Sequence, residues 1–392
     1  MTTIYDLPKP GHVALKRSRA LSECIRQEIA KQHGVISFAT FMELALYHPT
    51  LGFYNADTFT LGKHGDFTTA PEISPLFAKC FAKQIQQISN NLSSNNILEL
   101  GAGTGRFAND LLSELDQNGC LPQHYYIYEI SHGLRKKQQE FLRSACPHFF
   151  SRITWLDVLP VNFIGTIIAN EVLDALPVHC FHIEDATVKE RCIRIEKDEF
   201  TWQLEPPTTE TLANEILKMR DHYALSSGYD SEINLYIHEF IPCIANALTQ
   251  GIILFADYGY GQREYYHPER RQGTLTCFYQ HRRHNNPLLL PGLQDITTHV
   301  DFTRVIEIAA DTGCSLAGFT SQSAFLLACG LMNIAADEEK HLSPINEFRL
   351  HHAIKLLTMP TEMGERIKIM ALSKNIELPL LGFHLQDRRR DL

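Results

Sequence analysis

The chain has 392 residues, enough for two average domains or for one large α/β domain with insertions. Its composition, with 44% hydrophobic and 21% charged residues, is that of an ordinary globular protein. The net charge of -9 argues against general nucleic-acid binding, which needs a basic surface.

Cysteine and histidine usage excludes further classes. The ten cysteines are scattered between Cys24 and Cys329 without a CxxC pair, which indicates free thiols in a reducing compartment. No HExxH motif occurs among the nineteen histidines, so we expect no metal site. No apolar signal core opens the chain, and no run of about 20 apolar residues could span a membrane. We therefore expect a cytoplasmic protein without a membrane span.

Residues 1–90 are expected to form an extension of helices and loops. Ser37 is a favourable N-cap for a helix that ends at Tyr47, and another helix is expected from about residue 75 to 89. The long loop between them is rich in glycine, threonine and aromatic residues, as functional loops often are. Within it the run GDFTT, which includes Thr68, combines a carboxylate with two hydroxyl groups, although a plain turn before a helix is an equal alternative.

Residues 96–115, NILELGAGTGRFANDLLSEL, contain the strongest local signal. An apolar strand is followed by Gly101, Gly103 and Gly105 and then by a helix with one apolar face. Such a strand, glycine turn and helix begin a nucleotide-binding βαβ unit, in which the helix N-terminus offers free N–H groups to a ligand. The dinucleotide fingerprint would require a third glycine at Arg106. The pattern E-x-G-x-G-x-G resembles instead the first motif of class I S-adenosylmethionine-dependent methyltransferases.

Two carboxylates follow the next two predicted strands. Residues 125–128 form a strand that ends at Glu129, roughly 20 residues after the glycine loop, where an acid can hold both ribose hydroxyls. Residues 153–156 form a third strand that ends at Asp157, where methyltransferases place a side chain against the adenine amino group. A solvent-facing Glu129 and an aspartate turn at Asp157 are the alternatives.

Strands four and five bring further polar residues to the same edge of the sheet. Residues 163–169 lead into Asn170, Glu171 and Asp174, and residues 251–256 lead into Asp257. Ligands of open α/β sheets bind at the carboxyl ends of strands, so these side chains are expected at the mouth of a pocket. The i, i+3 spacing of Glu171 and Asp174 would put both carboxylates on one face of a helical turn.

The rest of the chain completes an α/β pattern. Hairpins are expected between residues 178 and 205, a basic, aromatic and turn-rich segment between 261 and 300, and two last strands at 316–320 and 367–372. The fold class is therefore α/β and Rossmann-like, with a seven-stranded, mostly parallel sheet. We expect residues 91–392 to be the catalytic domain, with insertions near 178–234 and 261–300 that lie over the pocket.

Nearly the whole chain resembles one family of class I methyltransferases, the MidA family. The matching stretches are MELALYHPTLGFY, GDFTTAPEISPLF, ILELGAGTGRF, ANEVLDALPV, FADYGY, QGTL, QDITTHVDFT and EMGERIKIMAL. The family includes a mitochondrial complex I assembly factor, so the resemblance implies methylation of a protein arginine, in the mitochondrial relatives on a complex I subunit. It also implies that residues 1–90 cover the cofactor site.

These expectations give a set of candidate site residues. The cofactor-binding candidates for S-adenosyl-L-methionine are Thr68, Glu99, Gly101, Ala102, Gly103, Gly105, Glu129, Ile130, Asp157, Val158 and Asn170. Glu171, Asp174 and Asp257 are the catalytic candidates, because carboxylates can hold a guanidinium in a bidentate grip and turn one nitrogen toward the methyl group. Glu171 on the cofactor and Asp174 as a helix cap are the alternatives. The expected partner is a protein substrate, and a homodimer stays open.

Three other functions are compatible with parts of this pattern. One is a catalytically silent assembly or scaffold protein that keeps the cofactor pocket as a folding element. A second is a methyltransferase of a small molecule. The third is a nicotinamide-dependent oxidoreductase, against which Arg106 at the third glycine position argues.

Overall fold

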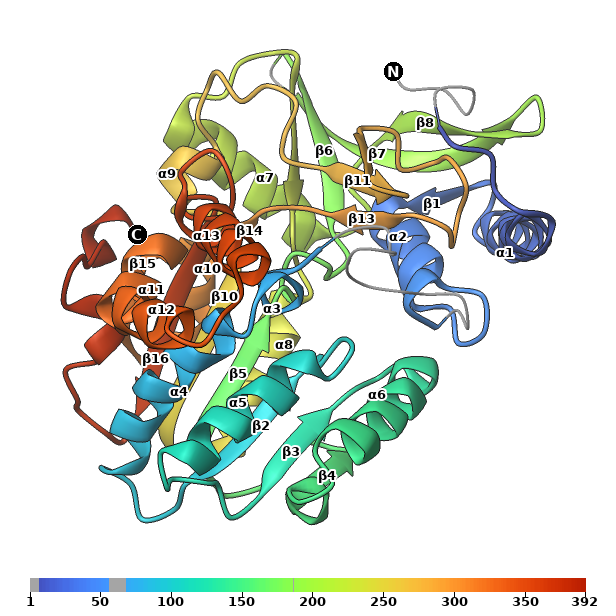
Figure 1. Ribbon diagram of the computed structural model, residues 1–392. Helices are drawn as coiled ribbons and strands as arrows, with labels where there is room; N and C mark the ends of the chain where they lie inside the picture. Colours follow the sequence, from blue (N-terminus) through green and yellow to red (C-terminus); the bar gives the residue numbers. More distant parts are fainter. Residues whose placement is uncertain (1–6, 56–67, 186) are drawn as a thin grey trace.

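The computed structural model describes residues 7–55, 68–185 and 187–392. A large lobe surrounds an eight-stranded sheet, and a smaller lobe with two further sheets lies beside the carboxyl ends of its central strands (Figure 1). Within the described ranges every helix is too short or too polar to cross a bilayer.

The main sheet has the strand order β15-β16-β10-β5-β2-β3-β4, and a short β14 pairs with the end of β10. Its strands are β2 (Asn96–Leu100), β3 (Tyr125–Tyr128), β4 (Ile153–Leu156), β5 (Phe163–Asn170), β10 (Leu248–Tyr260), β14 (Val300–Asp301), β15 (Ser315–Ser321) and β16 (Ile367–Lys374). The strands from β10 to β4 run parallel, whereas β16 runs antiparallel to both of its neighbours. The predicted mostly parallel sheet is confirmed.

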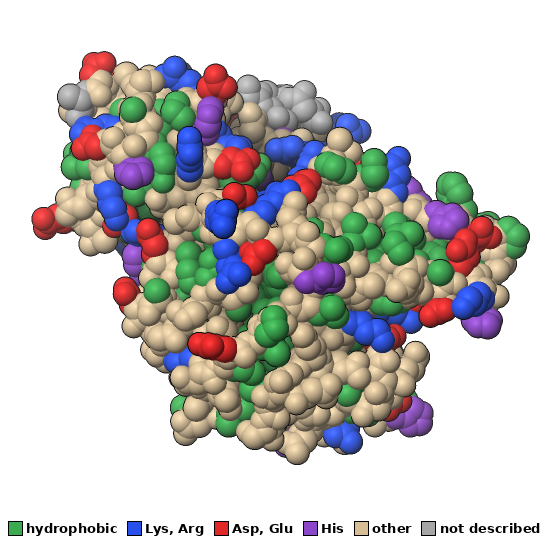
Figure 2. Space-filling model, turned by 90° about the vertical axis from the view of Figure 1, so that its left-hand side faces the viewer, with side chains coloured by type: hydrophobic (Ala, Val, Ile, Leu, Met, Phe, Trp, Pro, Cys, Tyr) green, Lys and Arg blue, Asp and Glu red, His purple; other side chains and the backbone are tan. Residues whose placement is uncertain are grey.

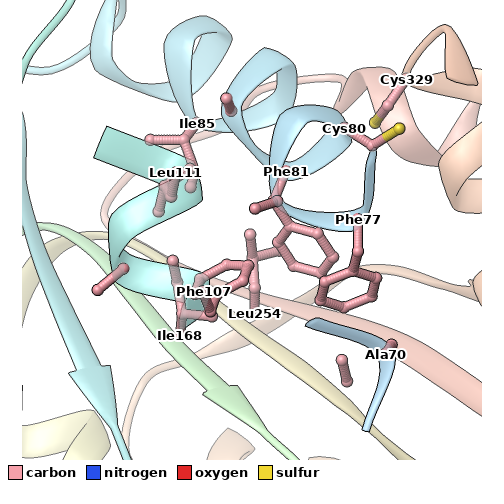
Figure 3. Packing of buried hydrophobic residues seen from close by; sticks show 14 of the residues in the cluster. Ala70, Phe77, Cys80, Phe81, Ile85, Phe107, Leu111, Ile168, Leu254 and Cys329 are labelled. Atoms are coloured by element: carbon pink, nitrogen blue, oxygen red, sulfur yellow. The ribbon is translucent and has the colours of Figure 1, made fainter. Parts of the chain in front are cut away.

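Helices cover both faces of this sheet. They are α3 (Ala70–Ile73), α4 (Leu76–Ser89), α5 (Arg106–Gln117), α6 (His132–Ala145), α8 (Ile237–Ala247), α9 (Gln262–Tyr265), α10 (Phe302–Ala310), α11 (Gln322–Ala328), α12 (Leu331–Glu339) and α13 (Pro344–Thr358). Helices α4, α5 and α11 to α13 pack on one face, and α8 and α10 pack on the other. Figure 3 shows Phe81 of α4 against Phe107 of α5, at 5.7 Å between ring centroids, above Ile168 and Leu254 of the sheet. This packing fixes the helix that follows the glycine loop.

The second lobe joins the N-terminal extension to the two insertions. It contains α1 (His12–Lys31), β1 (Val35–Ser37), α2 (Phe38–Tyr47), β6 (His179–Glu184), β7 (Thr187–Glu196), β8 (Glu199–Glu205), α7 (Glu210–Tyr223), β9 (Tyr229–Ile233), β11 (Thr276–Tyr279), β12 (Arg282–His284) and β13 (Asp295–Thr297). Strand β1 pairs with β7, and Phe38 and Phe41 of α2 share a core with Ile193, Cys277 and Ile296. The extension is therefore held by residues far along the chain.

Short sequence patterns correctly predicted some of these elements, such as α2. Ser37 caps α2 as predicted, because its hydroxyl accepts a hydrogen bond from the Thr40 N–H at 3.1 Å. Helix α4 falls within the predicted extension but packs on the main sheet. The boundary at residue 90 stays a prediction.

Candidate functional site

A cavity of about 360 Å³ lies between the carboxyl ends of β2, β3 and β5 and the second lobe. This volume falls within the range of small-molecule sites. Its walls come from the extension, the glycine loop, the ends of β3 and β5, and helix α8. The lining residues include Glu43, Tyr47, Tyr54, Glu72, Glu99, Gly101, Ala102, Gly103, Glu129, Ile130, Asn170, Glu171, Tyr236 and Phe240.

The glycine loop turns sharply at the edge of this cavity. Gly101, Gly103 and Gly105 have φ values of 65°, 53° and 84°, which other residues adopt only with strain. A Cβ atom at Gly101 would also lie 3.1 Å from the Val172 side chain. Helix α5 begins directly after Gly105 and has no side-chain cap, so its first N–H groups face the loop region.

Short helix α3 from the extension is anchored on the same loop. The Thr104 hydroxyl donates a hydrogen bond to Glu72 of α3, and Arg106 Nε forms an ion pair with the same carboxylate at 3.2 Å. Arg106, which replaces the third glycine of the dinucleotide fingerprint, therefore ties the extension to the cofactor loop. This contact is a structural reason for a side chain at that position.

Glu129 follows directly after β3 and lines the cavity. Its two carboxylate oxygens accept hydrogen bonds from the Ser131 N–H and from Gln138 Nε2, both at 2.9 Å. Gln138 also donates to the Gly103 carbonyl at 3.0 Å and accepts from Trp155 Nε1 at 3.0 Å. Burial raises the pKa of Glu129. The network fixes this carboxylate beside the glycine loop, as its predicted ribose role requires.

Glu99, the acidic residue of the glycine motif, also lines the cavity. Its carboxyl group is buried and accepts a hydrogen bond from the Tyr125 hydroxyl at 2.8 Å. Burial raises its pKa to about 8. The group therefore stays largely protonated at neutral pH and can donate as well as accept a hydrogen bond.

Asn170 and Glu171 lie opposite the glycine loop at the end of β5. Glu171 has a left-handed backbone, with φ of 50°, and its N–H donates to the Ala256 carbonyl at 2.8 Å. Among the described residues its carboxylate accepts two long hydrogen bonds, from the Ala70 N–H at 3.4 Å and from Asn170 Nδ2 at 3.3 Å. Asn170 Oδ1 is buried without a hydrogen-bond partner among the described residues. Strained backbone and underused acceptors are typical of functional sites.

The electrostatic setting of Glu171 is unusual. Burial, followed by the charge of Asp257, raises the pKa of Glu171 to about 8. Within the described ranges neither Glu171, Asp174 nor Asp257 forms an ion pair with a Lys, Arg or His side chain. A buried acid cluster without a counter-charge disfavours ionisation and would be stabilised by a bound cation.

Asp257 does not line the cavity but binds the backbone of the turn that follows Glu171. Its Oδ2 atom accepts hydrogen bonds from the N–H groups of Val172, Leu173 and Asp174, at 3.1, 2.8 and 3.3 Å. It is buried and does not line the cavity, and burial raises its pKa to about 7. Its carboxylate therefore positions the turn that carries Glu171.

Asp174 is also buried and does not line the cavity. It is 5% exposed, and burial together with the charge of Asp257 raises its pKa well above the usual range. Its backbone carbonyl accepts a hydrogen bond from the Thr298 N–H at 2.9 Å. Of the three catalytic candidates, only Glu171 faces the cavity.

Two tyrosines from the extension were missed as site residues. Tyr47 donates to the Ala175 carbonyl at 2.9 Å, and Tyr54 donates to Asp295 Oδ1 at 2.8 Å. Their ring centroids lie 5.5 Å apart, and both rings line the cavity beside Glu171. The sequence signal was present in the stretch MELALYHPTLGFY, but nothing local showed that it folds back over strand ends more than a hundred residues away.

Of the remaining cofactor candidates, Thr68, Ile130, Asp157 and Val158, only Ile130 lines the cavity. Ile130 is 61% exposed at the cavity edge, while Val158 is 76% exposed outside the lining. The Asp157 side chain is 84% exposed and pairs with Arg135. Thr68 borders residues 56–67, so the rest of the predicted GDFTT motif before it lies outside the described residues. The structure thus gathers the glycine loop, Glu129 and Asn170, but not Asp157.

Comparisons with known proteins agree with this geometry. Residues 76–320 match the model of a family described as S-adenosyl-L-methionine-dependent methyltransferases. The chain is 36% identical to a protein from Burkholderia thailandensis whose crystal structure contains S-adenosyl-homocysteine, with a TM-score of 0.93, covering 98% of this chain and 100% of that one. A native structure from the same organism gives 36% identity and a TM-score of 0.90 at the same coverage.

The chain is also similar to proteins that are named protein arginine methyltransferases. The chain is 28% identical to "Protein arginine methyltransferase NDUFAF7 homolog, mitochondrial" of Drosophila melanogaster, covering 96% of this chain and 92% of the relative. It is 27% identical to "Protein arginine methyltransferase NDUFAF7, mitochondrial" of Homo sapiens, covering 87% and 81%. The expected cytoplasmic location was wrong on this comparison, because these relatives are mitochondrial proteins. The apolar-run and signal-core criteria behind that expectation do not detect organelle targeting.

Proposed function

This chain belongs to the family of S-adenosyl-L-methionine-dependent methyltransferases whose model it matches, and we propose that it methylates an arginine side chain of a partner protein. One observation carries the proposal. Glu171 is a half-buried, cavity-lining carboxyl group with buried carboxyl groups behind it and no cationic partner among the described residues. A cationic acceptor would supply the missing charge.

A guanidinium suits this half of the cavity better than an ammonium. It is planar and offers paired N–H donors in a fixed fork, whereas an ammonium is a point charge. Glu171 can accept two of these donors, and the Tyr47 and Tyr54 rings offer aromatic faces on which a guanidinium can stack. The names of the curated relatives support the same acceptor.

The other half of the cavity fits the cofactor. The glycine turns bring backbone without a Cβ atom to the cavity wall, Glu129 presents a preorganised carboxylate, and Asn170 has an unused acceptor. We propose that these residues and Ile130 hold S-adenosyl-L-methionine, with Thr68, Asp157 and Val158 at the rim. The cofactor supplies an activated methyl group.

The residues of the chain then have three tasks. The cavity excludes water from the reacting groups, Glu171 orients one guanidinium nitrogen, and Asp257 holds the turn on which Glu171 sits. The nitrogen loses a proton when it is methylated. Glu171 is placed to accept this proton, because burial raises its pKa to about 8 and makes its carboxylate a stronger base.

The proposal is tested by identifying the acceptor. Purified protein is incubated with methyl-labelled S-adenosyl-L-methionine and lysate from a strain that lacks the gene, and the labelled residue is mapped by mass spectrometry. We expect the label on arginine, with a respiratory complex I subunit as the first candidate. Label on lysine, RNA or a small molecule alone would refute the arginine proposal and leave the family assignment intact.

A further inference from the structure

The cavity lining carries acidic side chains but no basic ones among the described residues. On the face shown in Figure 2, Lys and Arg side chains lie beside Asp and Glu side chains, so both signs of charge are mixed on the surface. The cavity lining differs from that surface, because its charged side chains are five glutamates: Glu43, Glu72, Glu99, Glu129 and Glu171. A lining of one charge sign favours a ligand of the opposite sign.

Four of these glutamates already have a place in the site. Glu72 forms an ion pair with Arg106 at 3.2 Å, and Glu129 accepts two hydrogen bonds of 2.9 Å in the cofactor half. Glu99 is buried near the end of β2, and Glu171 lines the acceptor half. The fifth glutamate has no such role.

Glu43 is an exposed carboxylate of the cavity lining. It accepts a hydrogen bond from the Tyr236 hydroxyl at 2.8 Å, but within the described ranges no Lys, Arg or His side chain forms an ion pair with it. Burial, together with the hydrogen bond to Glu43, raises the pKa of Tyr236 to about 13. The tyrosine is therefore a neutral donor and leaves the negative charge of Glu43 unbalanced.

Two helices, one from each lobe, bring these side chains together. Glu43 and Tyr47 are one turn apart on α2, and Tyr236 and Phe240 are one turn apart at the start of α8. All four residues line the cavity, as expected for side chains that share one face of a helix. The hydrogen bond from Tyr236 to Glu43 joins the two faces. We call Glu43, Tyr236 and Phe240 the entrance subsite.

The entrance subsite belongs to the acceptor side of the cavity. Tyr47, one turn from Glu43, donates a hydrogen bond to the carbonyl of Ala175, four residues after Glu171. One such turn of an α-helix rises by about 6 Å. In an extended peptide, side chains two residues apart point to the same side and are separated by about 7 Å. This spacing matches one substrate side chain at Glu171 and a second one at Glu43.

We propose that the entrance subsite binds a second cationic side chain of the protein substrate, a Lys or Arg two residues from the target arginine. The inference rests on the proposed function, since it assumes that an arginine of a protein enters the cavity. Glu43 supplies the counter-charge, and the rings of Tyr236 and Phe240 offer aromatic faces to the cation. The resulting rule of specificity is that arginines with a basic residue at this spacing are preferred over arginines with an acidic one.

Two substitutions separate this role from a purely structural tie between the lobes. Glu43→Gln removes the charge but keeps an oxygen that can accept a hydrogen bond from Tyr236. Tyr236→Phe removes the hydrogen bond but keeps the aromatic ring and the charge of Glu43. A structural tie is weakened more by Tyr236→Phe, whereas a subsite that selects charge is weakened more by Glu43→Gln.

Peptide binding measures the subsite without turnover. Fluorescein-labelled peptides carry one central arginine and either Lys or Glu at both positions two residues away, in an otherwise identical Gly/Ser sequence. Each is titrated with the full chain saturated with S-adenosyl-homocysteine, and fluorescence anisotropy is recorded. We expect the Lys peptide to bind about fivefold more tightly than the Glu peptide, and Glu43→Gln to reduce this ratio to about twofold or less.

Two control variants should keep the preference for the Lys peptide. One is Tyr236→Phe, which retains the carboxylate. The other is Glu239→Gln, which makes the same charge change on an exposed residue of α8 outside the cavity lining. A melting temperature within a few degrees of the wild type and retained S-adenosyl-homocysteine binding show that the variants are folded.

The outcomes distinguish the subsite from the proposed function. Equal affinity of the wild type for both peptides, no detectable binding of the Lys peptide, or an equal loss of preference in Glu43→Gln and in either control would overturn the subsite. Replacement of the central arginine by citrulline, which is neutral and similar in shape, tests the proposed function instead. Equal binding of the arginine and citrulline peptides would contradict arginine as the acceptor, whereas the ratio between Lys and Glu peptides still reports on Glu43.

Discussion

The two halves of the cavity are built in opposite ways. Most of the cofactor half comes from one continuous part of the chain, residues 99–138, and Asn170 at the end of β5 completes it. The acceptor half combines Tyr47 from the extension, Ala70 from α3, Glu171 from β5 and Tyr236 before α8. One half is thus specified by local sequence, and the other exists only after the two lobes have come together.

The carboxylates of the two halves also differ in how firmly hydrogen bonds hold them. Glu129 is fixed by two hydrogen bonds of 2.9 Å, whereas the Glu171 carboxylate accepts longer ones, of 3.3 and 3.4 Å, from the part of the chain that the structure describes. A preorganised group suits a cofactor that binds at every turnover. A half-buried carboxylate with long, weak hydrogen bonds suits a charged methyl acceptor that brings its own N–H donors. The comparison predicts that the halves can be disabled separately.

The largest effect is expected from blocking the cofactor half. Gly103→Val should abolish S-adenosyl-homocysteine binding in calorimetry, because a β-branched side chain opposes φ of 53° and would occupy ligand space. Gly119→Val is the matched control, since Gly119 has φ of 66° but lies outside the lining, with open space around it. Equal loss of binding in both variants would mean that backbone strain, not the cavity, is responsible.

In the acceptor half, Glu171→Gln keeps the shape and removes the charge. Methyl transfer should fall by about 100-fold or more, because the acceptor loses its orienting partner, while cofactor affinity stays within a few-fold of the wild type. Steady-state kinetics and calorimetry on one preparation measure both. Glu377→Gln, an equal change on an exposed residue outside the cavity lining, should have little effect. A parallel loss of cofactor affinity in Glu171→Gln would place this residue in the cofactor half.

The same contrast explains what could be read from the sequence. The strands of the parallel part of the main sheet, the glycine loop and the position of Glu129 at a strand end follow from strand, turn and helix signals that lie close together. The roles of Asp174 and Asp257 could not be separated from that of Glu171, because all three follow strand ends and only side-chain direction distinguishes them. Nor could sequence place Tyr47 and Tyr54, whose position depends on β1 pairing with β7. Helix α13 was missed because its polar and apolar residues separate weakly into faces.

A smaller effect is expected at the ribose position. Glu129→Ala should weaken the cofactor by roughly 1.5–3 kcal/mol, the range for a charged hydrogen-bond partner. Calorimetry with S-adenosyl-homocysteine measures the change, and the exposed Glu140→Ala on α6 serves as control. Normal cofactor affinity with reduced turnover would contradict the ribose role.

Asp257→Asn tests whether this residue positions the acceptor half rather than binding the acceptor. The amide would present N–H groups to backbone donors that now share one carboxylate, so the free energy of unfolding in urea should fall by about 1–3 kcal/mol. Turnover should fall with it, while the exposed Asp311→Asn changes neither. Unchanged stability with a raised KM for the acceptor would instead make Asp257 a direct binding group.

The pH dependence of acceptor binding tests the central claim most directly. The pKa of Glu171 is raised to about 8, so below pH 8 the group is mostly protonated and a guanidinium must displace a proton to bind. The KM of an arginine substrate should therefore fall by about fivefold between pH 7 and pH 8 and level off above it, whereas Glu171→Gln should show no such fall. If the wild type and Glu171→Gln show the same pH profile, the acceptor does not bind at the Glu171 carboxylate.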